Sequence, residues 1–215
     1  VGANALTGVG LFLPINMLLT AFAMLCGAGG APRAAIAMGR KDLDTAEKIV
    51  ANCFTLLLCF AAVLTAVFYF SAPALLRLFG ASDVTLPYAL SYARIYILGS
   101  VFVLVVMGMN PFITTQGFAK ISMLTTVIGA VINIILDPLF IFTFDMGIAG
   151  AAWATVLAQC AALGIVMRHF RDKNRPFHFE KGIATLDWRV AKDSMAIGLG
   201  PFLMNSAACL VTLFI

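Results

Sequence analysis

The chain has 215 residues, of which 62% are hydrophobic and only 11% are charged, and its formal net charge is +4. A soluble domain usually carries about 25% charged residues, so this chain has too few polar groups to cover its own surface in water. These values exclude an ordinary soluble domain and predict a membrane protein.

Apolar runs set the expected number of helices. A helix needs about 20 apolar residues to cross roughly 30 Å of hydrocarbon. Barrel strands alternate polar and apolar residues, and these runs do not. We therefore expect an all-α polytopic membrane helix bundle with about six transmembrane helices, in the nearly charge-free runs 1–32, 49–76, 95–119, 121–144, 146–167 and 194–215.

Both ends of the chain resemble the ends of a fragment. Val1 is not an initiator methionine, and no basic segment precedes the first apolar run as it would in a signal peptide. The last residues, "SAACLVTLFI", stop inside an apolar run. We therefore expect this chain to be part of a longer membrane protein.

The positive charges predict an orientation. Of the 14 Lys and Arg residues, all but Arg77 and Arg94 lie in or beside the first, third and fifth loops. By the positive-inside rule these basic loops are cytoplasmic, so we expect a multi-pass protein of the plasma (inner) membrane. The basic charge fits this topology and contact with anionic membrane lipid. No motif or aromatic–basic patch predicts a nucleic-acid partner.

The fifth loop is the longest and most charged, and "RDKNRPF" within it contains Pro176. It is the best candidate for a boundary between two bundles. Trp188 and the basic residues of "LDWRVAKDSM" favour a short interfacial helix leading into the last span. We expect a first group of helices in 1–172, a cytoplasmic linker in 173–190 and the start of a second bundle in 191–215.

The run "NIILDPLFIF" carries an aspartate, Asp137, inside an apolar span. A charged aspartate facing lipid would cost about 2.5–3.5 kcal/mol, so Asp137 should face the bundle interior or water. Asn133 lies one turn earlier on the same face. Thr155, on the returning helix, lies at a similar depth, roughly 13 Å from the shared turn. Together they offer oxygen ligands suited to Na⁺, a hydronium-like ion or a shared proton.

Pro138 follows this aspartate. Because proline has no N–H, we expect a kink in the helix and a freed carbonyl near Ile134. Broken helices with freed carbonyls recur at ion sites in transporters. The alternative is that Asp137 only joins helices through hydrogen bonds, or pairs with Arg94. The residues alone leave these alternatives open.

Other polar and small residues have simpler interpretations. His169 and His178 fall in a basic loop and are expected to be solvated, while Pro14 and Pro111 favour plain helix geometry over a cavity. The run "CGAGGAPR" lacks a following Gly-Lys-Ser/Thr and is expected to allow close helix packing. Isolated amides within spans favour interhelical hydrogen bonds: Asn16, Asn110 and Gln159. The cysteines lack ligand spacing and are expected to be small core residues: Cys26, Cys53, Cys59, Cys160 and Cys209.

Several stretches together resemble the multidrug and toxic compound extrusion (MATE) family. They are "GAPRAAIAMGRKDLDTAEKIV", "LLRLFGASDVTLPYALSYARIYILG", "INIILDPLFIF", "MGIAGAAWATVLAQ" and "IGLGPFLMNSAACLV". The resemblance covers nearly the whole chain, and the third and fourth stretches are its most specific part. It implies twelve helices in two lobes, of which this chain would hold helices two to six and most of helix seven.

The resemblance also implies a cation site in the first lobe. Its positions fall on Asn133 and Asp137 of helix five, on Thr155 of helix six and on the backbone carbonyl of Ala151. An acidic residue on helix one completes the site in the family, and this chain lacks that helix. Some relatives carry an acid on helix seven, where this chain offers only the amide of Asn205.

The implied activity is secondary antiport. Cationic or amphipathic drugs or toxic compounds would be exported in exchange for Na⁺ or H⁺, with no cofactor beyond the coupling ion. The partners would be membrane lipid, a small organic substrate and the missing second lobe. Two alternatives are a lipid-linked precursor flippase, which would place several Arg or Lys in its cavity, and an inactive truncated fragment. An intramembrane enzyme is disfavoured because the spans contain one aspartate and no histidine.

Overall fold

The computed structural model describes residues 3–179 and 186–214, and every regular element within them is helical. Six of the helices are long and apolar enough to span a membrane, which confirms the expected bundle. The elements are α1 (Ala3–Gly10), α2 (Leu13–Gly39), α3 (Leu43–Leu78), α4 (Leu86–Thr115), α5 (Ala119–Pro138), the π-helix η1 (Leu139–Thr143), α6 (Gly147–Arg171) and α7 (Trp188–Phe214).

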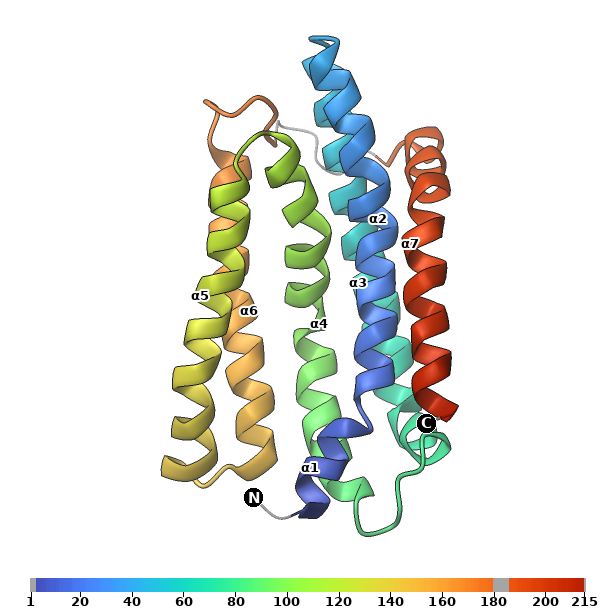
Figure 1. The fold of residues 1–215 in the computed structure, drawn as a ribbon, viewed down its shortest axis with the longest axis vertical. Helices are drawn as coiled ribbons and strands as arrows, with labels where there is room; N and C mark the ends of the chain where they lie inside the picture. The colour runs from blue at the N-terminus through green and yellow to red at the C-terminus, as the bar shows by residue number, and fades with distance from the viewer. Residues whose placement is uncertain (1–2, 180–185, 215) are drawn as a thin grey trace.

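The long helices run side by side and alternate in direction (Figure 1). The α2–α3 turn, the α4–α5 turn and the α6–α7 connection meet at one end, at the top of Figure 1. We call this the basic end, because the first, third and fifth loops gather there with most of the lysines and arginines. The α3–α4 loop and the α5–α6 turn lie at the opposite end. The side of the membrane that each end faces stays a prediction.

Local residue types explain where the helices begin. A break at Leu11–Phe12 separates α1 from α2, and Pro14 lies in the first turn of α2, where its missing N–H breaks no helical bond. Asp42 caps α3 by accepting a hydrogen bond from Thr45 N at 3.1 Å. Pro111, in contrast, lies inside α4, which continues through it.

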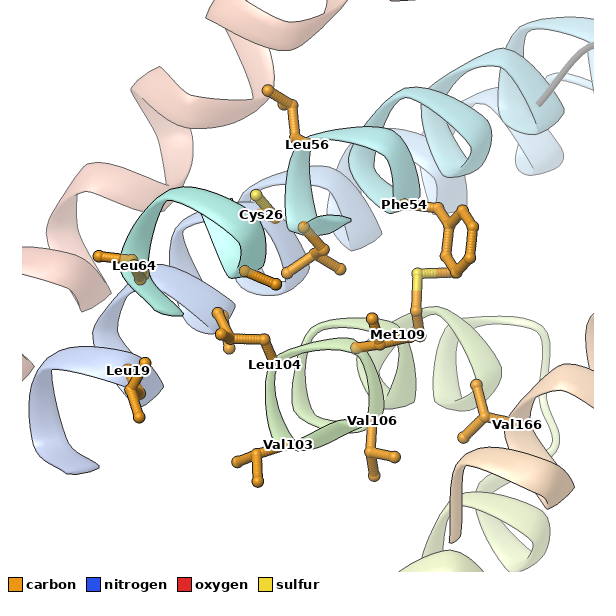
Figure 2. Close-up of a cluster of buried hydrophobic side chains, with 14 of the residues drawn as sticks. Leu19, Cys26, Phe54, Leu56, Leu64, Val103, Leu104, Val106, Met109 and Val166 are labelled. Carbon is orange, nitrogen blue, oxygen red and sulfur yellow. The ribbon is translucent and has the colours of Figure 1, made fainter. Parts of the chain in front are cut away.

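The packed core lies between α2, α3 and α4. Leu19, Leu57, Leu104 and Met109 are at most 1% exposed, and Figure 2 shows Leu19 and Met109 among the buried side chains of this region. Lipid tails are as apolar as leucine, so van der Waals packing, rather than escape from the surroundings, stabilises such contacts in a membrane. The core therefore depends on how closely these helices fit.

Glycines permit that fit where α2 meets its neighbours. A Cβ added at Gly27 would lie 2.6 Å from the backbone oxygen of Gly108 on α4. A Cβ at Gly29 would clash with the carbonyl oxygen of Ser194, and one at Gly198 with that of Leu25. The close packing predicted for the glycine-rich run is confirmed, and it joins α2 to both α4 and α7.

Two of the three isolated amides, Asn16 and Asn110, form hydrogen bonds between helices. Asn16 accepts a hydrogen bond from Tyr96 Oη at 2.9 Å, which joins α2 to α4. Asn110 accepts one from Thr125 Oγ1 at 3.0 Å, which joins α4 to α5. For Gln159, the buried Oε1 has no partner among the described residues. The prediction of interhelical hydrogen bonds is thus confirmed for Asn16 and Asn110 only.

The expectation that the two histidines are solvated is wrong. His169 is 3% exposed and lies 2.9 Å, through Nε2, from Gln116 Oε1. His178 is partly buried, with Nδ1 3.0 Å from Glu47 Oε1. The physical reason is that the chain after α6 folds back onto the basic end, where Phe177 is fully buried.

The cysteine prediction holds in part. Cys26, Cys53 and Cys209 are buried, as expected of small core residues, but Cys59 and Cys160 are exposed on the bundle surface. A cysteine in an apolar span can lie either in the protein core or on the outer surface of the bundle. The sequence does not distinguish these two positions. Of the predicted linker 173–190, residues 180–185 lie outside the described residues, and α7 already begins at Trp188.

Candidate functional site

The α5–α6 hairpin carries the candidate site. Asp145 and Gly147 both adopt positive φ, of 52° and 56°, and so turn the chain sharply between η1 and α6. A Cβ at Gly150 would lie 2.8 Å from the backbone carbon of Phe140. Small residues at the start of α6 thus let the two arms approach closely, as the sequence predicts.

Asn133, Asp137 and Thr155 lie together, as predicted from their depth. One orientation of the Asn133 amide avoids facing its oxygen to the carboxylate. In it, Nδ2 donates to Asp137 Oδ2 at 3.1 Å, and Oδ1 accepts from Thr155 Oγ1 at 3.2 Å. All three side chains are partly buried. Asn133 therefore bridges the carboxylate of α5 and the hydroxyl of α6.

The carbonyl oxygen of Ala151 completes this cluster. Thr155 Oγ1 lies 3.0 Å from Ala151 O, one turn earlier on α6. A hydroxyl has a single hydrogen, so Thr155 donates either to Ala151 O or to Asn133 Oδ1. One carboxylate, one amide, one hydroxyl and one carbonyl thus lie next to one another in a continuous series of contacts. Such oxygen donors suit hard cations or a bound proton.

Pro138 marks a change of helix type. The helix α5 ends at Pro138, and the chain continues as the π-helix η1. Proline offers no N–H to the carbonyl one turn back, so the regular bond pattern stops there. Single π-turns are rare and often occur at functional sites. The interruption was predicted from the proline, whereas its π form was not.

Sequence reasoning missed Tyr92. It lies on α4, is 9% exposed, and its hydroxyl lies near the side chain of Thr155. Its ring stacks on Tyr96 with centroids 5.8 Å apart, and Tyr96 reaches Asn16 on α2. A tyrosine in an apolar run gives no sequence signal of such a role. The polar cluster thus continues from α5 and α6 across α4 to α2.

The pairing of Asp137 with Arg94 is not found. Arg94 is exposed on α4, and the ion pairs of the described residues do not include it. Within the same residues, no group of three His, Cys, Asp or Glu side chains could hold a metal ion. Among the described residues, the hydrogen bond to Asp137 comes from Asn133.

Six helices long and apolar enough to cross a membrane define the class of this protein, a multi-pass membrane protein. The model of the MatE family matches residues 1–139, about two thirds of the chain. The chain belongs to the MatE family.

Known relatives agree with this assignment. The chain is 28% identical over 186 residues to the probable multidrug resistance protein YoeA of Bacillus subtilis, covering 85% of this chain and 40% of that protein. It is 27% identical over 202 residues to the multidrug export protein MepA of Staphylococcus haemolyticus, covering 94% of this chain and 45% of that protein.

A solved structure, described as the inward-facing conformation of a multidrug resistance MATE family transporter, superposes with a TM-score of 0.94 at 26% identity. The match covers 99% of this chain and 49% of that one. The chain thus spans about half the length of the relatives it matches. These relatives are transporters rather than enzymes.

Proposed function

We propose that this chain forms the first lobe of a cation-coupled antiporter that exports cationic or amphipathic organic compounds. The observation that carries the proposal is the cluster of Asp137, Asn133, Thr155 and the Ala151 carbonyl in the α5–α6 hairpin. The relatives named for multidrug resistance and multidrug export support the substrate class. A second lobe would supply the other half of the transport path.

The coupling step follows from the chemistry of the cluster. An ionised Asp137 accepts a hydrogen bond from the Asn133 amide. An arriving Na⁺ or proton would neutralise the charge of the Asp137 carboxylate. Asn133 Oδ1, Thr155 Oγ1 and Ala151 O are the neighbouring oxygens that would share the cation. One charge moving down about 100 mV yields roughly 2.3 kcal/mol, enough for a concentration ratio of about fifty-fold.

Pro138 would connect this step to helix shape. It follows Asp137 directly and ends the α-helical part of α5. Neutralising Asp137 would weaken the hydrogen bond that it accepts from Asn133. The bend between α5 and η1 would change as a result. The two lobes would then favour opening to one side of the membrane. Unchanged transport kinetics in Pro138→Ala would contradict this step.

The test is efflux of a cationic dye by the two-lobe protein in membrane vesicles, with a Na⁺ gradient and a pH gradient imposed separately. Asp137→Asn should abolish gradient-driven efflux at unchanged membrane insertion, and the gradient that drives the wild type identifies the ion. The matched control is Asp145→Asn in the α5–α6 turn, where Asp145 is exposed and asparagine tolerates the positive φ. Full efflux in Asp137→Asn would return this aspartate to a structural role.

A further inference from the structure

A groove lies between α5 and α6 at the basic end. Its volume is about 1030 Å³, and most of its lining from the helix interiors is apolar. This part of the lining consists of Ile121, Leu124 and Ile128 of α5 and Gly164, Ile165 and Met167 of α6. Gly164 leaves room here, since no atom lies within 4 Å of a Cβ built on it.

This groove faces away from the candidate coupling site. Nine residues of α-helix make about two and a half turns, so residues nine apart lie on opposite faces. Leu124 of the groove is nine residues before Asn133, and Ile128 is nine before Asp137. The groove is therefore on the far side of the α5–α6 pair from the polar cluster.

The far side of α5 is open. Leu124 is 46% exposed, and only 11% of the most apolar window of α5 is buried within the described chain. The described helices therefore leave this side of the groove uncovered. An uncovered apolar surface on a membrane-length helix is suited to contact with lipid hydrocarbon.

At the basic end the lining changes to charged residues. Three arginines and one aspartate line the groove there, with a net charge of two positives: Arg168, Arg171, Arg175 and Asp172. Asp172 forms an ion pair with Arg175, in which Asp172 Oδ2 lies 3.1 Å from Arg175 Nε. No carboxylate of the described residues pairs with Arg168 or Arg171. These two, three positions apart, lie on neighbouring turns of one helix face.

The third arginine is held in place by the returning chain. The guanidinium carbon of Arg175 lies 4.3 Å from the ring centre of Phe118. Two residues later, the carbonyl of Phe177 accepts a hydrogen bond from Gln116 Nε2 at 3.1 Å, and Gln116 in turn contacts His169. Arg175 is thus held in place at the charged end of the groove, beside Arg168 and Arg171, whose side chains are exposed.

We propose that this groove binds an anionic phospholipid, with its phosphate between Arg168 and Arg171 and an acyl chain along Leu124, Ile128 and Gly164. Charge complementarity selects the headgroup, since basic pockets between helices near a membrane surface recognise anionic lipid. Arginine pairs with phosphate through two parallel hydrogen bonds. The apolar length of the groove selects a lipid over a soluble phosphate. The proposal does not depend on the transport activity.

The first test measures lipid retained by the purified chain in neutral detergent, using native mass spectrometry. Dioleoyl phosphatidylglycerol and dioleoyl phosphatidylcholine are titrated separately. The wild type should retain one phosphatidylglycerol in preference to phosphatidylcholine. Because one arginine near the surface contributes roughly a five-fold preference, Arg168→Gln/Arg171→Gln should lower phosphatidylglycerol affinity by about 25-fold.

The control removes the same charge elsewhere at the basic end, as Arg40→Gln/Arg189→Gln, where both side chains are exposed. It should keep the preference. Equal losses in the two double variants, or equal retention of both lipids by the wild type, would overturn the proposal, because the attraction would then be a general effect of charge or absent.

A second test fills the apolar part. Gly164→Phe should reduce phosphatidylglycerol retention, whereas Gly200→Phe, which also has no atom within 4 Å of its Cβ, should not. Glycerol phosphate at millimolar concentration serves as the soluble competitor. Retention unaffected by Gly164→Phe, or full displacement of the lipid by glycerol phosphate, would show that acyl chains do not occupy the groove and would overturn the proposal.

Discussion

The helices α4 and α5 have the same mean hydropathy, 2.0 in their most apolar windows, yet 61% of that window is buried in α4 and only 11% in α5. The helix α4 packs on α2, α3 and α6 and carries fully buried Phe112 and Ile113. The helix α5 buries only Thr125 and Gly129. Hydropathy therefore shows that a helix lies in the membrane, but not whether its neighbours are protein or lipid.

The two helices are also joined to the bundle by different means. Apolar side chains fill the contacts of α4, as Figure 2 shows for Val103, Leu104, Val106 and Met109. The helix α5 is connected through polar contacts, from Thr125 to Asn110 and from Asn133 to Thr155. The helix α5, which carries the candidate site, is thus joined to its neighbours by polar contacts and by packing on α6.

The largest effect should come from crowding α4. Gly27→Leu would force a side chain against the Gly108 backbone, which cannot move aside. We expect a loss of about 3 kcal/mol or more in unfolding free energy, or no folded protein. Unfolding in mixed micelles measures it, with Gly164→Leu on α6 as the control that should leave stability unchanged. If Gly27→Leu and Gly164→Leu had equal effects on stability, the close packing at α4 would not be what distinguishes it.

Removing side chains should separate α4 from α5 directly. Phe112 is 0% exposed and Ile134 is 70% exposed. Phe112→Ala leaves a cavity and should cost about 3–5 kcal/mol. Ile134→Ala changes an exposed side chain and should stay within about 0.5 kcal/mol of the wild type. The same unfolding measurement compares them, and a cost at Ile134 near that at Phe112 would mean that α5 is packed after all.

The polar joint of α5 should contribute little stability. A double-mutant cycle of Asn133→Ala and Thr155→Val isolates their interaction, which we expect to be about 0.6 kcal/mol, the average for interhelical hydrogen bonds in a membrane. Gradient-driven efflux should fall in both single variants. A coupling energy above about 2 kcal/mol with unchanged efflux would make this cluster a structural joint and not a coupling site.

The smallest effect belongs to the exposed cap of α3. The hydroxyl and backbone N–H of Thr45 donate to Asp42 and hold the pKa of that carboxyl below its usual value. Because the folded pKa is depressed, the cap stabilises the helix end above about pH 4, the unfolded value, and is lost as the pH falls through the folded pKa. Asp42→Ala should speed amide exchange at the start of α3 at pH 7, and this difference should vanish in acid. A difference that persisted in acid would exclude the carboxylate as its cause.

Much of the site was predictable because it depends on distances along two helices. Equal numbers of residues from one turn placed Asp137 and Thr155 at one depth, and the spacing of four placed Asn133 on the same face. Tyr92 was not predictable, because its partner lies on a helix far away in the sequence. The burial of His169 was missed for a similar reason, since a charged loop gave no sign that it folds back.

The sequence by itself determined the membrane class, the six spans, the basic loops and the one acidic position inside an apolar run, because lipid imposes length and charge rules on each segment separately. The tertiary structure decided which apolar helix is buried in the core and which is left exposed by the described residues. It also brought Tyr92 to Thr155 and built the arginine-lined groove between α5 and α6. Those features depend on contacts between segments, where glycines and small side chains set how closely backbones approach.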